Sequence, residues 1–171
     1  MGSRRLILLR HGQAQPEDAK TSDFERVLTP RGAHEAAEAG RHLVSAGWKP
    51  DLIIVSPAAR TLATAVIVAE HCGIDGTLIE AARGLYQASE QAIWRIICAC
   101  AAAPGAAHVG CLLVCGHNPG LSQLASRLGP RPERRGMPTA GIATALWTHG
   151  DWPDLQPEGA RRFELFAPQR A

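Results

Sequence analysis

Short apolar runs alternate along this chain of 171 residues with longer segments whose apolar residues recur at helical spacing. The first, second and fourth runs are almost continuously apolar, which is typical of strands covered on both faces. The six expected strands are 5–9, 52–55, 76–79, 111–115, 142–147 and 162–166. Strands that alternate with helices build a mostly parallel sheet with helices on both faces. The pattern therefore predicts the α/β class, as a three-layer α/β/α sandwich.

Four segments between the strands carry apolar residues at i, i+3, i+4 and i+7, the spacing of one buried helix face. Thr29-Pro30 supplies an N-cap residue and a proline suited to the first helical position, and Ser56-Pro57 repeats that pattern. Ser89 is expected to cap the third helix, and Asn118-Pro119 to open the fourth. The expected buried faces are Ala33, Ala36, Ala37, Gly40 and Val44; Leu62, Ala65, Val66 and Ala69; Ile93, Ile96, Ile97 and Cys100; and Leu121, Leu124, Ala125 and Leu128.

Length and composition suit one globular domain over residues 1–171. The net charge is only +2, which argues against nucleic acid as the main partner, because such domains usually carry a basic excess. The five cysteines are odd in number and show no C-x-x-C spacing, which favours free thiols in a reducing compartment. The four apolar residues before Arg10 are too few for a signal segment or a membrane span. We expect a cytoplasmic monomer without a membrane partner.

Polar residues follow three of the expected strands, at the point where each strand ends. Residues 10–12 are Arg-His-Gly, residues 56–60 are Ser-Pro-Ala-Ala-Arg, and residues 116–118 are Gly-His-Asn. In an open α/β sheet, ligands bind in the crevice outside the carboxyl ends of the strands. The three segments are therefore predicted to form one site, although they lie far apart in the chain.

Two arginines in these segments, Arg10 and Arg60, indicate an anionic ligand. Their planar guanidinium groups match phosphate oxygens bidentately and stay charged at any working pH. The helices expected to start near residues 56 and 118 add free N–H groups and positive dipole ends. Gly12 and Gly116 allow the backbone to approach a ligand closely. Phosphate fits this set best.

Two histidines, His11 and His117, add a nucleophile and a cation to the same site. Imidazole has a pKa of about 6.5, so much of it is neutral near pH 7, and a neighbouring arginine lowers that pKa. We expect His11 to attack phosphorus through one ring nitrogen while a backbone carbonyl holds the other N–H. We expect His117 to be protonated beside phosphate and to stabilise the charge on the transferring group.

Taken singly, these residues are weak indications, because a lone histidine at a strand end is usually a hydrogen-bonded loop residue. The other five histidines are interpreted as helix-surface or loop residues: His34, His42, His71, His108 and His149. The arginines of the irregular stretch 129–141 are interpreted as lying away from the site: Arg131, Arg134 and Arg135. The convergence of three separate strand ends is what supports a functional site.

The motifs also resemble a known family. They are L-L-R-H-G at 8–12, R-V-L-T-P-R-G at 26–32, P-D-L-I-I-V-S-P-A-A-R-T at 50–61, L-Y-Q-A-S at 85–89, V-C-G-H-N-P-G-L at 114–121 and T-A-G-I-A at 139–143. In order and spacing, over about positions 6–147, the chain resembles the histidine phosphatase superfamily, with its phosphoglycerate-mutase-like fold, and most of all the short SixA-type branch of phosphohistidine phosphatases. The resemblance implies that His11 is phosphorylated during the reaction, with no metal and no other cofactor. The residues then expected to bind substrate are Arg10, Gly12, Arg60, His117 and Asn118.

One position departs from many members of that family. Mutase-like and acid-phosphatase-like members usually carry an acidic proton donor shortly after the third strand, and Gln87 occupies the corresponding region here. An amide cannot donate a proton to an alkoxide leaving group. Glu80 and Glu90 are close in sequence, but the pattern places neither in the pocket. SixA-type proteins resemble this chain in lacking that acid.

The favoured hypothesis is a phosphatase in which His11 takes the phosphoryl group and water releases it. Phosphohistidine on a protein is the first-choice substrate. One alternative is a small-molecule phosphomonoesterase of the same superfamily. Another is a phosphate- or phosphoprotein-binding module without turnover, against which the presence of His11 argues. A histidine-based metal site is disfavoured, because two arginines stand beside the histidines.

Overall fold

A computed structural model describes residues 2–18, 20–101, 108–129 and 136–169 of the chain. The six strands are β1 (Arg4–Arg10), β2 (Leu52–Val55), β3 (Ile79–Ala81), β4 (Cys111–Gly116), β5 (Ile142–Trp147) and β6 (Arg162–Phe166). They form one sheet in the order β3-β2-β4-β1-β5-β6. The first four pair in parallel, whereas β5 and β6 join as antiparallel strands. This is the predicted α/β architecture with a mostly parallel sheet.

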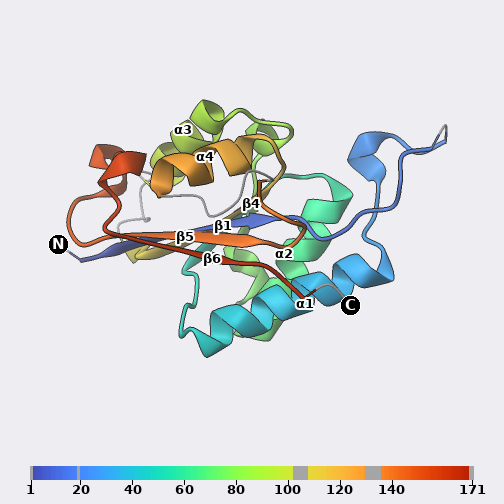
Figure 1. Ribbon diagram of the computed structural model, residues 1–171, viewed down its shortest axis with the longest axis horizontal. Coiled ribbons are helices and arrows are strands. Elements are labelled where there is room, and N and C mark those ends of the chain that lie inside the picture. Colours follow the sequence, from blue (N-terminus) through green and yellow to red (C-terminus); the bar gives the residue numbers. More distant parts are fainter. Residues whose placement is uncertain (1, 19, 102–107, 130–135, 170–171) are drawn as a thin grey trace.

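Helices cover both faces of the sheet, as Figure 1 shows. The helices are α1 (Pro30–Ser45), α2 (Ala59–Cys72), α3 (Glu90–Ala101) and α4 (Gly120–Leu128). The core has two parts: one contains Ile93 and Leu124 from the α3–α4 layer, the other Leu43 and Val68 from the α1–α2 layer. Because the central strands contribute apolar side chains to both parts, their sequences are almost continuously apolar.

The strand predictions are close, with one correction. For β5 and β6 the observed bounds equal the expected ones, and β1 and β4 extend the expected runs by one or two residues. The prediction of a strand over 76–79 is wrong, because residues Gly76–Leu78 form a 3-10 turn and β3 starts only at Ile79. The carboxylate of Asp75 accepts a hydrogen bond of 2.8 Å from the N–H of Thr77 and holds that turn.

Two helix starts also need correction. Thr29 caps α1 as expected, and its hydroxyl accepts a hydrogen bond from the N–H of Gly32. The start predicted at Ser56-Pro57 is wrong, since α2 begins at Ala59 and the Ser56 hydroxyl contacts a histidine ring instead. Helix α4 likewise begins at Gly120, after the predicted Asn118-Pro119 start. In both places the expected capping side chain belongs to the site.

The buried helix faces are partly as expected. All four expected residues of α4 are buried. On α1, however, Val44 is 55% exposed, and the buried face is Gly32, Glu35, Ala36, Ala39, Gly40 and Leu43. Glu35 accepts a hydrogen bond from the N–H of Gln13, which turns α1 towards the strand-end loop. On α2, Val66 is 43% exposed, whereas the polar residues Arg60, Thr61 and Thr64 are buried. The side chain of Cys100 lies outside the described residues.

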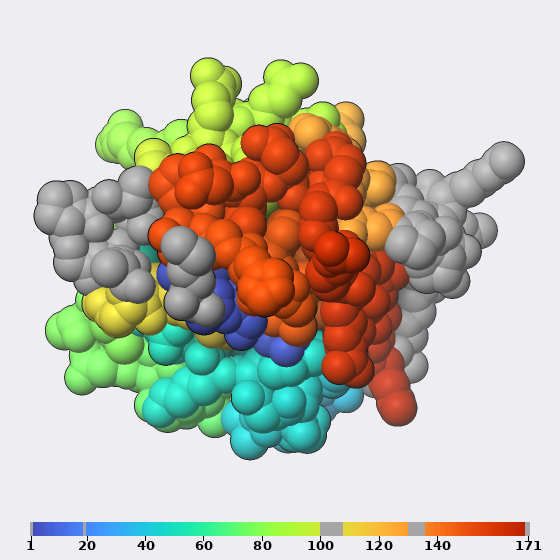
Figure 2. Space-filling model, turned by 90° about the vertical axis from the view of Figure 1, so that its left-hand side faces the viewer, coloured from blue at the N-terminus to red at the C-terminus, as the bar shows by residue number. Residues whose placement is uncertain are grey.

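The two ends of the sheet differ in how they are covered. Residues 148–161 lie across the end where β1 begins, between the two helix layers (Figure 2). The indole of Trp152, only 2% exposed, donates a hydrogen bond of 2.8 Å to the Val109 carbonyl there. At the opposite end, residues 13–18 and 20–28 project from the body of the molecule (Figure 1); we call these residues the η1 loop after the 3-10 turn η1 (Asp23–Glu25). The strand ends that carry the predicted site lie beside this loop.

Candidate active site

The structure brings the three predicted strand-end segments together. Arg10 ends β1 and lies opposite Gly116 in β4, so that His11 and His117 leave adjacent parallel strands. The N–H of His11 donates a hydrogen bond of 3.2 Å to the Gly116 carbonyl. The two imidazole rings lie 5.3 Å apart, centroid to centroid. Backbone pairing alone therefore places both histidines at the same edge of the sheet.

His11 has one ring nitrogen held and the other available as a lone pair. Its Nδ1 lies 2.8 Å from the Gly12 carbonyl, an acceptor, so Nδ1 must carry the proton. Its Nε2 faces the Nε–H of Arg60 at 3.4 Å and therefore carries the lone pair. Burial, together with the charge of neighbouring arginines, lowers the pKa of His11 to about 4, although the Gly12 hydrogen bond opposes the shift. His11 is thus neutral and nucleophilic near pH 7.

Gly12 fixes the turn that carries the His11 ring. Its N–H donates a hydrogen bond of 3.0 Å to the Thr64 hydroxyl on α2. A Cβ at this position would lie 2.3 Å from the carbonyl oxygen of Gly32 on α1, a distance that real Cβ atoms do not show. Glycine is required at this position because the backbones of residues 12 and 32 approach each other too closely for a Cβ atom.

Arg60 lies between the two histidines and is only 4% exposed. Its Nε–H points to Nε2 of His11, and its Nη2 lies 3.3 Å from Nδ1 of His117. An arginine on a helix is usually solvated, but the first turn of α2 faces the strand ends and buries this one, as the predicted site requires. A guanidinium directed between two imidazoles is well placed to bind an anion shared by them.

His117 is also neutral near pH 7. Its Nδ1 accepts from Arg60, so its Nε2 carries the proton and donates a hydrogen bond of 2.8 Å to the buried Ser56 hydroxyl. Burial, followed by the nearby His11 and Arg60, lowers the pKa of His117 to about 3. The imidazolium expected at this position stays a prediction for the phosphate-bound protein, because a dianion beside the ring would raise its pKa.

Arg10 and Asn118 meet at one backbone carbonyl. Both donate to the oxygen of Met137, Arg10 through Nη1 at 2.8 Å and Asn118 through Nδ2 at 3.0 Å. The Ser122 hydroxyl in turn donates to the Asn118 side chain and accepts from the Met137 N–H. Within the described part of the chain, the buried Nε–H of Arg10 has no hydrogen-bond partner. Arg10 therefore retains an unused donor, whereas Asn118 donates to the Met137 carbonyl and anchors that residue.

Two residues of this site, Asp23 and Tyr86, were not predicted from the sequence. The Asp23 carboxylate, on the η1 loop, lies 2.8 Å from Nη2 of Arg60 and accepts a hydrogen bond of 2.7 Å from the Tyr86 hydroxyl. Gln87, in the region expected to hold an acid, points its amide at the same carboxylate at 3.4 Å. Residues 13–28 are rich in charged residues, but nothing in that stretch of sequence distinguishes Asp23 from the other acids.

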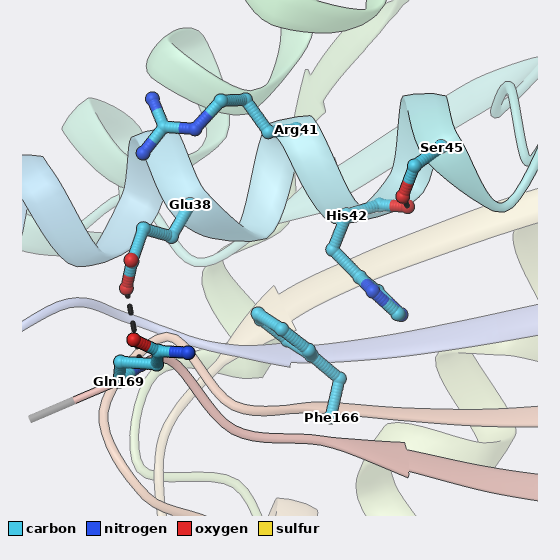
Figure 3. A pocket seen from close by; sticks show the side chains of 6 residues that line it. All are labelled: Glu38, Arg41, His42, Ser45, Phe166 and Gln169. Carbon is cyan, nitrogen blue, oxygen red and sulfur yellow. Dashed lines mark hydrogen bonds between the residues drawn. The ribbon is translucent and has the colours of Figure 1, made fainter.

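The other candidate acids lie elsewhere. Glu80 is exposed on β3, and Glu90 forms an ion pair with Arg127 at 3.7 Å. A second hollow, lined by His42 and Phe166 among others, lies between α1 and the end of β6 (Figure 3) and shares no residue with the strand-end site. Among the residues that the structure describes, no three His, Cys, Asp or Glu side chains are grouped to hold a metal ion. None of the described helices is both long and apolar enough to cross a bilayer.

Comparison with known proteins places this geometry in a family. The model of the histidine phosphatase superfamily (branch 1) matches residues 6–96, a little over half of the chain. Among solved structures, SixA from Agrobacterium tumefaciens, a proposed phosphohistidine phosphatase, is 26% identical, with a TM-score of 0.76 over 96% of this chain and 99% of that one. The corresponding protein of Nakamurella multipartitia is also 26% identical, with a TM-score of 0.77 over 98% of both chains.

Curated relatives match over a shorter stretch. The protein At3g52155 of Arabidopsis thaliana, a chloroplastic protein, is 45% identical over 62 residues, which make up 36% of this chain and 28% of that protein. The first curated relatives are covered over only 24% to 29% of their own length. Identity with them is therefore limited to part of the domain.

Proposed function

Because this chain belongs to the histidine phosphatase superfamily, we propose that it is a phosphatase that works through a phosphorylated His11 and removes phosphate from phosphohistidine on a protein. The observation that carries the proposal is the His11 ring itself. Its Nδ1 proton is held by the Gly12 carbonyl, and its Nε2 lone pair faces the Arg60 guanidinium in a pocket shared with His117. A nucleophile and an anion-binding group thus meet at one point.

In the proposed reaction, the Nε2 lone pair of His11 attacks phosphorus, and the bond from phosphorus to the leaving group breaks. The leaving group departs with the bonding electrons, while Arg10 and Arg60 stabilise the charge on the phosphoryl oxygens. Water then attacks phosphorus, the P–N bond breaks with its electron pair returning to Nε2, and inorganic phosphate leaves with the oxygen and both protons of the water. His11 regains its lone pair, so the cycle closes.

Neither Asp23 nor Gln87 can act as a proton donor, which favours a substrate with a good leaving group. Burial raises the pKa of Asp23, but hydrogen bonds from Tyr86 and Arg60 outweigh that effect and hold the pKa well below its usual value. Asp23 is therefore ionised and has no proton to give, and Gln87 is an amide. Phosphohistidine needs no strong acid, because its leaving imidazole is protonated near neutral pH. The likeness to proposed phosphohistidine phosphatases over nearly the whole chain supports the same choice.

Two further expectations accompany this proposal. We propose that residues 1–171 form a single histidine phosphatase domain, which is supported by the joining of all six described strands in one sheet. We also propose a cytoplasmic setting, which is supported by free thiols at Cys72, Cys98, Cys111 and Cys115.

Rapid quench with an aryl phosphate or a phosphohistidine peptide tests the mechanism. The wild-type protein should yield an acid-labile phosphoenzyme that is absent in His11→Ala. His34→Ala, which removes an exposed histidine of α1, is the matched control and should retain both phosphoenzyme and turnover. Full activity in His11→Ala would overturn the mechanism, whereas binding of phosphate without turnover in the wild type would favour a binding module.

A further inference from the structure

Asp23 contacts Arg60 through both its side chain and its backbone. Nη2 of Arg60 donates to the Asp23 carboxylate at 2.8 Å, and Nη1 donates to the Asp23 carbonyl oxygen. The aspartate reaches this position from the η1 loop, whereas Arg60 lies in the first turn of α2. The carboxylate and the backbone carbonyl of Asp23 thus both bind the buried guanidinium of Arg60.

The guanidinium has two faces, and Asp23 takes only one of them. Nη1 and Nη2 form the end-on pair of donors, which binds Asp23. Nε and the remaining proton of Nη2 form the side-on pair, which points to Nε2 of His11 and to Nδ1 of His117. With its end-on pair held, the guanidinium cannot rotate about its long side chain, and its side-on pair stays directed between the two imidazoles.

Asp23 is itself held by several donors. The Tyr86 hydroxyl donates to Oδ2 at 2.7 Å, Gln87 approaches the same oxygen at 3.4 Å, and Nη1 of Arg26 donates to Oδ1 at 2.8 Å. The Asp23 side chain is 26% exposed, and that of Arg60 only 5%. A fully hydrogen-bonded carboxylate next to a buried arginine is a rigid support rather than a loose surface ion pair.

Two other roles for this carboxylate fit the contacts less well. A proton donor would need a protonated carboxyl group, whereas every hydrogen bond given for Asp23 comes from a donor and stabilises the ionised form. A carboxylate that blocks the phosphate site would lie against the side-on pair of Arg60, between the histidines. Asp23 instead lies on the end-on pair and leaves that direction to His11 and His117.

We propose that Asp23 is a positioning residue: its carboxylate and carbonyl hold Arg60 so that Nε–H and Nη2–H converge on the phosphoryl group during its transfer to His11. The inference rests on the proposed phosphatase function. It makes Asp23 a residue of the η1 loop that supports the reaction, acting through Arg60 rather than on the substrate. Tyr86 and Gln87 then contribute by holding the aspartate.

The experiment compares Asp23→Asn and Asp23→Ala with the wild type on an aryl phosphate. The matched control is Glu25→Gln, which removes a charge from the same turn and bonds only to Ser22 in the described contacts. We expect kcat to fall roughly 10²-fold in Asp23→Ala, because a misplaced catalytic group costs about that much. Asp23→Asn retains an oxygen acceptor and should lose less, and Glu25→Gln should match the wild type. In an Arg60→Ala background, Asp23→Ala should add no further loss.

An NMR measurement gives a readout that needs no turnover. The Arg60 Nε–H signal, identified by its loss in Arg60→Lys, should be sharp and slow to exchange in the wild type and in Glu25→Gln. It should broaden or disappear in both Asp23 variants, while thermal melting shows whether each variant is folded. Affinity for inorganic phosphate should fall in the same two variants.

Several outcomes would overturn the proposal. An unchanged Nε–H signal with unchanged kcat in both variants would show that Arg60 needs no such support. Faster turnover or tighter phosphate binding would show that Asp23 obstructs the site. A loss confined to alkyl phosphates would identify Asp23 as a proton donor. If the wild type forms no phosphoenzyme, the proposed function fails, but the NMR signal and phosphate affinity still decide whether Asp23 positions Arg60.

Discussion

The pocket has two halves that are built in different ways. The half at the strand ends contains Arg10, His11 and His117, together with Arg60 from the first turn of α2. Backbone hydrogen bonds that continue the sheet fix its strand-end segments; His11, for example, donates to Gly116 and accepts from Ala140. The other half, formed by the η1 loop with Tyr86 and Gln87, meets it through side chains, above all through the contacts of Asp23. The first half is an outcome of topology, whereas the second depends on the identity of a few loop residues.

The two halves therefore differ in the roles that their residues can take. In the proposed reaction, groups positioned by the sheet supply the nucleophile and the charge that phosphoryl transfer needs. Groups on the loops are free to vary without disturbing the sheet. The loop residues therefore determine which further side chains line the pocket, including whether a proton donor is present. Four measurements test this difference between the two halves.

The largest expected effect concerns the acid that the loop half does not provide. We expect kcat/KM to fall steeply as the pKa of the leaving group rises, because a positioned proton donor usually contributes about 10²–10⁴-fold. Phosphohistidine and aryl phosphates should turn over, whereas sugar phosphates and phosphoglycerate should barely react. The measurement is a series of phosphate esters of graded leaving-group pKa. A flat series would show that an acid operates in the loop half and would favour a small-molecule phosphomonoesterase.

The next effect concerns Arg60 in the strand-end half. Arg60→Ala should lower kcat by about 10²–10³-fold, the usual loss for a donor to transition-state charge. Arg60→Lys should lose less, since it retains the charge but not the fork. Replacing the arginines expected away from the site, Arg131, Arg134 and Arg135, should cost least; they lie outside the described residues. Equal losses at Arg60 and Arg134 would contradict the placement of the pocket.

A smaller effect is expected on stability as the pH falls. The pKa values of about 4 for His11 and about 3 for His117 lie below the unfolded value of about 6.5. Between pH 6.5 and 4 the unfolded chain therefore binds protons that the folded protein does not. The free energy of unfolding decreases as the pH is lowered through this range. Tm should drop between pH 7 and 5 by several degrees, since 1 kcal/mol is worth about 2–4 °C at this chain length.

The control for this measurement is the pair of single variants His11→Gln and His117→Gln. Each removes one titrating group from the strand-end half and should flatten the dependence of Tm on pH in that range. A wild-type Tm that does not change between pH 7 and 5 would show that both imidazoles titrate near their ordinary pKa, and that the pocket is more solvated than the structure indicates.

The smallest effect belongs to the outer part of the loop half. Tyr86→Phe removes the hydroxyl that donates to Asp23 but retains the ring that stands edge-on to His117 at 5.5 Å. One hydrogen bond of this kind is worth about 1 kcal/mol, so we expect kcat to fall by no more than about 5-fold. Phe24→Leu, a change in the ring packed against Tyr86, is the control for ring packing alone. A loss as large as that of Arg60→Ala would mean that the loop half carries the catalysis.

The sequence predicts the strand-end half well, because parallel strands bring their carboxyl ends to one edge whatever the loops do. His11, Arg10, Arg60 and His117 all lie where this rule puts them. The helix start at Ser56-Pro57 was wrong because local capping rules do not foresee a hydroxyl taken by a distant imidazole. Asp23 was missed for a similar reason. Its partners lie 37 and 63 residues away, and no periodicity encodes such contacts.

Gly12 has a consequence for any attempt to redesign this protein. Its N–H binds Thr64, its carbonyl holds the proton of the His11 ring, and its α-carbon lies against Gly32. A methyl group added here would push the turn away from α1 and release the ring proton to the other nitrogen, which would switch off the nucleophile while leaving every polar side chain in place. The residue with no side chain thus sets a firm limit on engineering, because its peptide selects the reacting atom of His11.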